Sequence, residues 1–208
     1  MRVLILSLLI VIADQVSKVL VKGISLPWLG ISLEGMQYGS SRQIVGDFLR
    51  LTYIENPGMA FGIDLGGKLI FSIFSVLASI AILVYLYKAR EESFALRMSL
   101  AMILGGAIGN LIDRVFYGVI FGEAPLFHGK VVDFFDIDFF NIDILGYHLS
   151  RWPVFNVADA AVTTGVVLLL FFHRSTETEE LTPVPVTVDP PASPQDPPGS
   201  PNFPTDQQ

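Results

Sequence analysis

Long apolar stretches separated by polar segments dominate the pattern of this chain. A helix that crosses the hydrocarbon layer of a membrane needs about 20 predominantly apolar residues, because the layer is about 30 Å thick. The stretches that approach this length are residues 3–21, 66–87, 98–117 and 156–172. We therefore predict an all-α membrane protein with four transmembrane helices, which places both chain ends on the same side of the membrane.

The composition supports this prediction. Hydrophobic residues make up 51% of the 208 residues, and the mean hydropathy of +0.56 is too high for an ordinary soluble domain. The first stretch has the basic start and apolar run of a secretory signal, but no small-x-small cleavage site follows it before the next charges. We therefore expect residues 3–21 to be retained as the first transmembrane helix.

The net charge of −7 comes almost entirely from one end of the chain. Residues 175–208 contain six acidic residues, no Lys or Arg, and nine of the 13 prolines. A segment of this composition cannot form an apolar core. We predict that residues 1–174 form the membrane domain and that residues 175–208 form a disordered tail. The nearly neutral remainder gives no reason to expect a nucleic-acid partner.

The short connection between the second and third stretches sets the expected orientation. It carries Lys88, Arg90 and Arg97, and short loops rich in Lys and Arg face the cytoplasm. We therefore expect both termini and the tail to be cytoplasmic. Residues 31–62 alternate apolar and polar positions around a turn-rich segment, which predicts a small external platform that contains β-strands. The long external loop 115–155 is rich in aromatic residues and is predicted to be an interfacial strand or a shallow amphipathic segment.

Polar residues inside the predicted helices gather toward the external face in this topology. A charge within a membrane costs at least about 2.5 kcal/mol, so it is usually paired or functional. Asp14 and Lys18 share one helical face as a possible ion pair. The glycines of 105–109 give a small-residue surface for close helix packing. The polar residues concerned are Asp14, Lys18, Asn110, Asp113, Arg114, Asn156 and Asp159.

The residue types limit the chemistry that these positions can perform. The chain has no cysteine and only three scattered histidines, so we expect no thiol nucleophile, no metal site and no cofactor. Two neighbouring carboxyl groups can share a proton, so that one acts as a base while the other acts as an acid. An aspartate pair is therefore the main hydrolytic option. Spacing alone leaves open whether Asp159 meets Asp133, Asp113 or Asp14.

Five motifs in order resemble those of the bacterial lipoprotein signal peptidases, also called signal peptidase II. They are "DQVSK" (14–18), "ENPGMAFG" (55–62), "GGAIGNLIDR" (105–114), "KVVDFF" (130–135) and "FNVADAAVTTG" (155–165). The resemblance implies a four-helix aspartyl endopeptidase of the bacterial inner membrane. Such an enzyme would remove the signal peptide from prolipoproteins by cutting before a cysteine that carries a diacylglyceryl group.

The same resemblance implies functional residues and partners. Asp133 and Asp159 match the catalytic aspartates of the family, and the active site would lie near the external leaflet. Expected partners are diacylglyceryl-modified prolipoproteins, membrane lipids and the inhibitor globomycin. In many members the first catalytic aspartate follows the "DR" pair closely, whereas 18 residues intervene here. The supporting or substrate-contacting residues would be Asp14, Lys18, Asn56, Gly58, Asn110, Asp113, Arg114, Asn156 and Ala158.

Two other classes of function are compatible with parts of the pattern. A small transporter or channel subunit could use Asp14, Lys18, Asp113 and Asp159 as an ion or proton relay, but a relay needs polar residues across the full membrane depth. The inner halves of the predicted helices are almost uniformly apolar. A non-enzymatic lipoprotein-binding protein could also share the fold. It would need the aspartates for stability and not for turnover.

Overall fold

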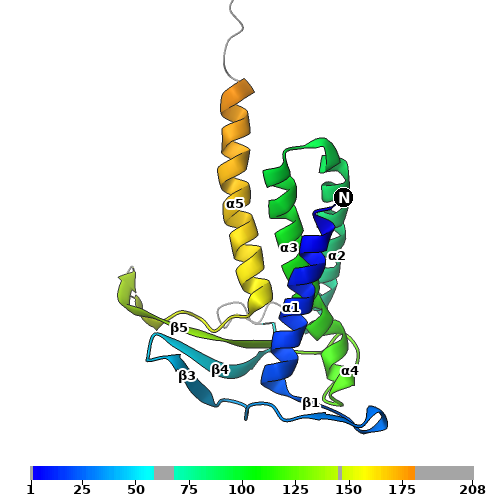
Figure 1. The fold of residues 1–208 in the computed structure, drawn as a ribbon, viewed down its shortest axis with the longest axis vertical. Helices are drawn as coiled ribbons and strands as arrows, with labels where there is room; N and C mark the ends of the chain where they lie inside the picture. The colour runs from blue at the N-terminus through cyan, green and yellow to red at the C-terminus, as the bar shows by residue number, and fades with distance from the viewer. Residues whose placement is uncertain (1, 59–67, 145–146, 181–208) are drawn as a thin grey trace, which may run out of the picture.

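Helices and a β-sheet form two distinct parts of the computed structural model, which describes residues 2–58, 68–144 and 147–180 (Figure 1). The helices run alongside one another, and the sheet lies at the end where α5 begins. A π-helical turn, η3, and the short α4 extend the third helix. The helical elements are α1 (Leu4–Lys22), α2 (Lys68–Lys88), α3 (Phe94–Ile112), η3 (Asp113–Tyr117), α4 (Gly118–Ile120) and α5 (Val157–Glu180).

Three helical segments among the described residues are long and apolar enough to span a membrane. They are Leu4–Lys22, Ser72–Glu91 and Phe94–Ile120. The fourth apolar stretch forms the shorter segment Val157–Phe171 at the start of α5. The helix itself continues to Glu180, beyond the predicted end at residue 172. The part of the expected tail from residue 181 onward lies outside the described residues.

Small residues allow α3 to pack closely against α1 and α5. A methyl group on Gly105 would lie 2.9 Å from the carbonyl oxygen of Ser7 in α1. A methyl group on Gly106 would lie 2.3 Å from the carbonyl oxygen of Ala158 in α5. Neither contact is tolerable for a real Cβ atom. The prediction that these glycines serve close helix packing is therefore confirmed.

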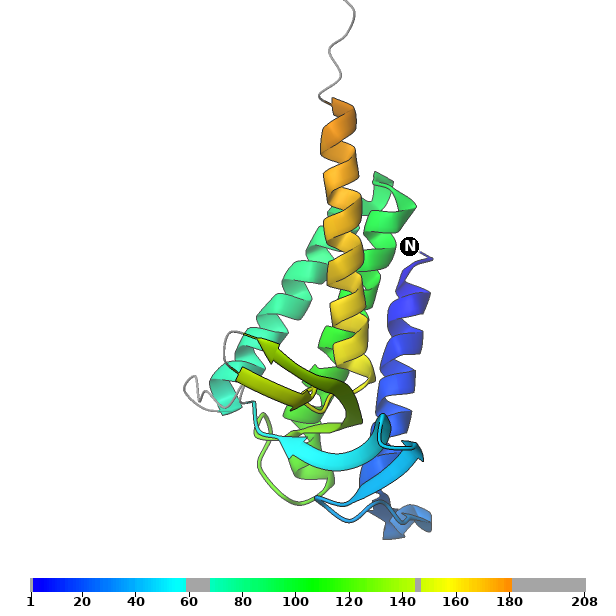
Figure 2. The same cartoon turned by 90° about the vertical axis from the view of Figure 1, so that its left-hand side faces the viewer.

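The sheet is antiparallel and has the strand order β3-β4-β5-β6, with β5 in a central position. Figure 2 shows it crossing beneath the start of α5. The strands predicted within residues 31–62 are present. Of the two alternatives predicted for the loop 115–155, the strand is present, because the second half of the loop supplies two further strands of the same sheet. The strands are β3 (Ser41–Val45), β4 (Leu49–Asn56), β5 (Val131–Ile144) and β6 (Tyr147–Arg151).

A separate hairpin and an aromatic core complete the connection between helices and sheet. The hairpin, β1 (Ile24–Leu26) paired with β2 (Ile31–Leu33), follows directly after α1. Tyr53 on β4, Val132 on β5 and Tyr117 on η3 are among the residues that form a buried apolar cluster with the end of α1. This cluster fixes the sheet against the helix ends, so residues on β5 have a defined position relative to α3 and α5.

Candidate active site

The first turn of α5 holds Asp159 in a reciprocal capping arrangement. The backbone N–H of Asp159 donates to Oδ1 of Asn156 at 3.0 Å, and the backbone N–H of Asn156 donates to Oδ2 of Asp159 at 3.2 Å. This is the geometry of a capping box, in which the side chains satisfy the N–H groups at a helix start. A carboxylate is also favoured there by the helix dipole. Oδ1 of Asp159 accepts a further hydrogen bond from Nδ2 of Asn110 at 2.7 Å.

Asp133 lies on β5 and faces the same asparagines. Its side chain is buried, with 2% of the residue exposed, and its Oδ1 accepts from Nδ2 of Asn156 at 2.6 Å. The side chain of Asn56 on β4 also hydrogen bonds to it. Asn156 therefore contacts both Asp133 and Asp159, through its side chain and its backbone respectively. The structure brings these two aspartates into one hydrogen-bonded group.

The surroundings of Asp133 favour its protonated form. Burial, followed by repulsion from the charge of Asp159, raises the pKa of the Asp133 carboxyl to about 7, although the hydrogen bond from Asn156 acts in the opposite direction. A carboxyl group with this pKa exchanges its proton close to neutral pH. Two interacting carboxyl groups that share one proton can supply an acid and a base at the same time.

A buried ion cluster lies behind this group. Nζ of Lys18 is 2.8 Å from Oδ2 of Asp14 and 2.8 Å from Oδ2 of Asp113, and all three side chains are fully buried. The predicted ion pair between Asp14 and Lys18 is therefore confirmed, and Asp113 is a second partner. Lys18 also donates to Oδ1 of Asn110 at 2.9 Å. Because Lys18 occupies that oxygen, the amide nitrogen of Asn110 is directed at Asp159.

The two acids of the ion cluster also hold the backbone beside the aspartate pair. Oδ1 of Asp14 accepts from the backbone N–H of Ala158 at 3.0 Å, one residue before Asp159. Oδ2 of Asp113 accepts from the backbone N–H of Val132 at 3.2 Å, one residue before Asp133. The cluster therefore positions α5 and β5 at the points where they carry the two aspartates.

Gln15 joins Asp14 to Asp113, and the sequence analysis did not predict this role. Its Nε2 donates to Oδ1 of Asp113 at 2.9 Å and to Oδ2 of Asp14 at 3.1 Å. The hydroxyl of Tyr117 in turn donates to the amide oxygen Oε1 of Gln15 at 3.1 Å. The position within "DQVSK", between two predicted polar residues, was the available signal.

The remaining predicted residues lie beside the aspartate pair. The backbone N–H of Gly58 donates to Oδ1 of Asn56 at 2.9 Å, and Gly58 has a φ of 99°, which favours glycine. This turn fixes the amide that bonds Asp133. Arg114 donates from Nη1 to the carbonyl oxygen of Asn110 at 3.3 Å, and its charge interacts with both Asp133 and Asp159. The end of the "ENPGMAFG" motif, from residue 59, lies outside the described residues.

A groove of about 250 Å³ opens beside Asp159. Its wall combines one carboxylate with apolar and aromatic side chains from β5, from the segment between β6 and α5, and from the first turns of α5. Such a surface can hold an apolar chain with a polar group at the carboxylate. The lining residues are Ile137, Trp152, Phe155, Asp159, Ala160, Thr163 and Thr164. Apart from Asp159, these residues were not predicted, although the aromatic content of loop 115–155 pointed to this segment.

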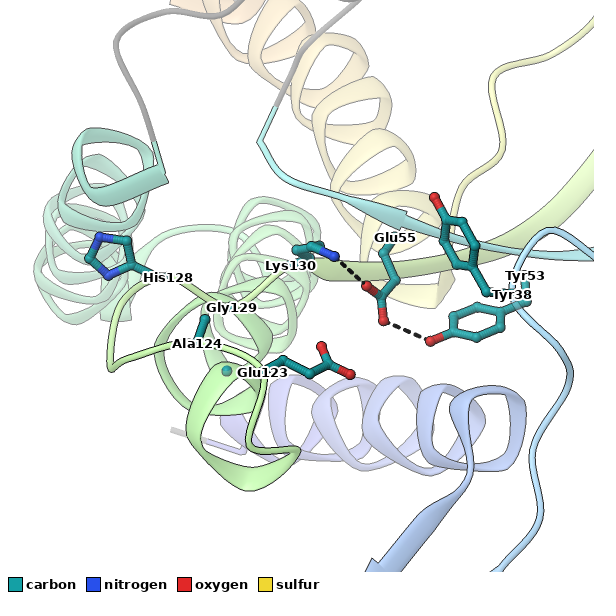
Figure 3. Close-up of a pocket in the computed structure, with 9 residues that line it drawn as sticks. Tyr38, Tyr53, Glu55, Glu123, Ala124, His128, Gly129 and Lys130 are labelled. Carbon is teal, nitrogen blue, oxygen red and sulfur yellow. Dashed lines mark hydrogen bonds and ion pairs between the residues drawn. The ribbon is translucent and has the colours of Figure 1, made fainter.

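A second charged group, the Glu55 cluster, was also missed in the sequence. Glu55 accepts hydrogen bonds from Lys130 at 2.9 Å and from the hydroxyl of Tyr53 at 2.7 Å (Figure 3). It also accepts one from Lys22. Burial alone would raise the pKa of Glu55, but these hydrogen bonds outweigh it and lower the pKa to about 2. Lys22 also bonds Glu123 at 2.7 Å. The cluster borders a pocket of about 330 Å³.

The fold and site together define a helical membrane enzyme. A solved bacterial membrane enzyme has a similar structure, with a TM-score of 0.61 and 27% identity, and the match covers 88% of this chain and 93% of that chain. A second solved bacterial membrane enzyme matches with a TM-score of 0.59 and 28% identity over 83% of this chain and 92% of that one. Both likenesses extend over most of this chain.

The particular family follows from the sequence comparisons. The family model described as signal peptidase (SPase) II matches residues 6–174, and the chain belongs to this family of aspartic peptidases. The lipoprotein signal peptidase of Chlorobium phaeobacteroides is 31% identical over 82% of this chain and 88% of its own length. That of Moorella thermoacetica is 36% identical over 81% of this chain and 90% of its own length.

Membership of this family assigns an enzymatic activity to the chain. The protein is a membrane peptidase whose family removes signal peptides from prolipoproteins. A transporter subunit and a non-enzymatic binding protein, the two other classes that the sequence pattern allowed, are therefore set aside. The family does not by itself assign the roles of individual residues, for which the geometry above is the starting point.

Proposed function

We propose that Asp133 and Asp159 together activate a water molecule that cleaves prolipoproteins before the diacylglyceryl-modified cysteine. The observation that carries this proposal is the position of Asn156, which bonds Asp133 at 2.6 Å through its side chain and Asp159 at 3.2 Å through its backbone. One residue thereby holds both carboxyl groups in a fixed relation. Preorganised groups of this kind lower the barrier because they need little rearrangement during the reaction.

The proton balance of the proposed reaction uses both groups. The carboxylate of Asp159 takes a proton from water while the water oxygen bonds to the carbonyl carbon. Asp133, which retains a proton up to a pH of about 7, protonates the carbonyl oxygen. The C–N bond then breaks, and the amine of the lipidated cysteine leaves with the proton held by Asp159. Asp133 regains its proton as the new carboxyl group forms, so no covalent intermediate with the enzyme is needed.

The groove beside Asp159 supports the choice of substrate. Aromatic and aliphatic side chains such as Trp152, Phe155 and Ile137 line it, and the carboxylate of Asp159 is at its edge. An apolar substrate segment in this groove would place a neighbouring peptide bond near the aspartates. We infer that membrane lipid surrounds the helices, and that globomycin competes with substrate for this cleft.

The arrangement of charge supports the proposed orientation. The connection between α2 and α3 carries Lys88, Arg90 and Arg97 and lies at the end of the helices opposite the sheet (Figure 1). The positive-inside rule places this connection in the cytoplasm of the bacterial cell. We infer four spans in the inner membrane, with Val157–Phe171 as the fourth, and both termini cytoplasmic. Residues 1–174 then form the membrane domain, and the sheet is an external platform near the outer leaflet.

A cleavage assay tests the proposed function directly. Purified protein in detergent is incubated with a diacylglyceryl-modified prolipoprotein, and the loss of the signal peptide is followed by gel shift. The unlipidated precursor serves as the matched substrate, and globomycin serves as the inhibitor control. We expect cleavage of the lipidated form alone, blocked by globomycin. Equal cleavage of both precursors would contradict the proposed substrate class, and no cleavage by folded protein would contradict the proposed reaction.

A further inference from the structure

The β1–β2 hairpin, residues 24–33, is unusually apolar for an exposed turn. Its sequence "ISLPWLGISL" contains no charged side chain. Trp28 and Leu29 at its tip are 78% and 52% exposed. Turns that face water are normally built from polar and small residues, because exposed aromatic surface is unfavourable in water. The hairpin therefore needs an apolar environment that the described part of the chain does not provide.

The register of the hairpin separates its apolar and polar side chains. Ser25 pairs with Ser32, whereas Leu26 pairs with Ile31 and Ile24 pairs with Leu33. Successive side chains along a strand point to opposite faces, so the serine pair lies on one face and the aliphatic pairs lie on the other. Ile31 and Leu33 are exposed as well. The hairpin is therefore amphipathic, with an apolar face that continues into the tip.

The position of the hairpin relates this apolar face to the membrane. An exposed apolar stripe runs along α1 at helical spacing and ends at Leu20, four residues before the hairpin begins. Figure 1 shows the hairpin turning outward at the foot of α1, on the side away from β3 and β4. Figure 2 shows it again at this end of α1, apart from the sheet. The stripe consists of Ile5, Leu8, Ile12, Val16 and Leu20.

We propose that the hairpin is a membrane anchor, with Trp28 and Leu29 inserted at the lipid boundary of the leaflet nearest the sheet. Tryptophan favours this boundary, where its ring contacts the acyl chains while its N–H reaches polar headgroups. Ser25 and Ser32 then face water. The anchor fixes the end of α1 at the membrane surface, together with the segment that leads from it into β3 and β4.

The structure favours lipid over a protein partner for this surface. The hairpin continues the exposed stripe of α1, which is the lipid-facing side of a membrane-spanning helix. A stable protein interface uses about 20–30 residues on each partner, more than the ten residues of this hairpin. The hairpin also lacks the charged groups that orient one protein on another.

Tryptophan fluorescence tests this proposal, because Trp28 and Trp152 are the two tryptophans of the chain. The Trp152→Phe variant is reconstituted into phosphatidylcholine and phosphatidylglycerol vesicles. Lipids brominated near the headgroup are compared with lipids brominated near the chain ends. We expect blue-shifted emission from Trp28. The shallow bromine label should quench most of this emission, whereas the deep label and aqueous iodide should quench little of it.

Matched variants separate insertion from other causes of the signal. In the Trp152→Phe background, Leu29→Asp should shift the emission to the red and restore iodide quenching, whereas Ser25→Asp on the polar face should leave both unchanged. Thermal melting of each variant verifies that it is folded. Emission that iodide quenches and bromine does not would overturn the proposal. A blue shift that varies with the protein-to-lipid ratio, without bromine quenching, would instead assign the hairpin to a second copy of the chain.

Discussion

The paired strands β4 and β5 carry one carboxyl group on each of their two faces, Asp133 on one and Glu55 on the other. The two groups differ in charge state. Glu55 pairs in register with Val132, and Ile54 pairs with Asp133. On one face, Asp133 is surrounded by asparagine amides and by Asp159, and its pKa is raised to about 7. On the other face, Glu55 is bonded by Lys130 and Tyr53 (Figure 3) and also by Lys22, and its pKa is lowered to about 2.

Burial acts on both groups, and the type of partner then decides whether its effect on the pKa persists or is reversed. Both side chains are buried, and burial alone raises the pKa of both. Two lysines reverse that effect for Glu55, whereas the asparagines offer hydrogen bonds without a positive charge. Glu55 is therefore ionised at neutral pH and suits a structural role. The Asp133 face can exchange a proton near neutral pH, as catalysis by acid and base requires.

The largest expected effect is a pH dependence of stability that arises from Asp133. Its pKa of about 7, against an ordinary value of 3.8, means that the folded state holds this proton more tightly than the unfolded chain. The stabilisation from the bound proton is therefore present at low pH and is lost as the pH rises from about 4 to about 7. The full difference is about 4 kcal/mol, since one pKa unit corresponds to about 1.4 kcal/mol.

Unfolding in detergent across this pH range measures the effect. The free energy of unfolding of the wild type is compared at each pH with that of Asp133→Asn, which cannot ionise at this position. Asp138→Asn on the same strand is the matched control, because its carboxylate contacts Arg151 at 3.4 Å and is partly exposed. A constant difference between wild type and Asp133→Asn from pH 4 to 7 would contradict the raised pKa.

The second effect concerns Glu55 and has the opposite sign. Its pKa of about 2, against an ordinary 4.5, means that its stabilisation is present above pH 4.5 and is lost as the pH falls toward 2. Glu55→Gln removes the charge that Lys22 and Lys130 bind, so we expect a loss of about 1–3 kcal/mol at neutral pH. Glu123→Gln removes the other partner of Lys22, and this more exposed pair should contribute less than about 1 kcal/mol.

Thermal unfolding at neutral pH compares these two variants. The cleavage rate should also fall in Glu55→Gln, because Glu55 immediately precedes Asn56, which bonds Asp133. Equal and small losses of stability in Glu55→Gln and Glu123→Gln would show that the Glu55 cluster does not stabilise the pairing of β4 with β5. In that case the contrast between the two faces would have no structural consequence.

The third and smallest expected effect on stability comes from Asn156→Ala. Loss of a helix cap costs about 1 kcal/mol. The same change removes the hydrogen bond that lowers the pKa of Asp133, so the pKa rises further and the activity should persist to higher pH. Ser93→Ala is the matched control, because the Ser93 hydroxyl caps α3 by accepting from the N–H of Leu96 at 3.2 Å.

The pH–rate profiles of the two cap variants distinguish a cap from a residue that tunes the aspartates. The activity remaining in Asn156→Ala should decline at a higher pH than in the wild type. In Ser93→Ala the decline should keep its wild-type position, with a similar loss of stability. Identical pH profiles for both variants would mean that Asn156 only caps the start of α5 and does not affect the pKa of Asp133.

Local contacts in this fold could be predicted from the sequence, and contacts between distant segments could not. The pair of Asp14 and Lys18 follows from a spacing of four residues, and the strands near residues 41–56 follow from alternation and turn residues. The pairing of β4 with β5 was not predicted, because the two strands are separated by α2 and α3. Alternation shows that a segment can be a strand but does not name its neighbour.

The candidate site divides in the same way. Spacing left open which acid meets Asp159, and only the resemblance to a family singled out Asp133. Asn156 and Asp159 could be read as a local cap, but the side chain that joins them to Asp133 acts across the fold. Gln15 and Glu55 lie within or beside the quoted motifs and were still missed. Their importance comes from partners on other elements, which no local pattern contains.

Cleavage by purified Asp159→Asn and Asp133→Asn enzymes tests whether these two aspartates carry out the reaction. Each variant is assayed with the diacylglyceryl-modified prolipoprotein beside wild type and Asp138→Asn, and thermal melting verifies that every protein is folded. We predict a loss of about 10²-fold to 10⁴-fold or more for the two aspartate variants, the range of general acid–base catalysis, and near-wild-type turnover for Asp138→Asn. Near-wild-type turnover by folded Asp159→Asn or Asp133→Asn would contradict this prediction.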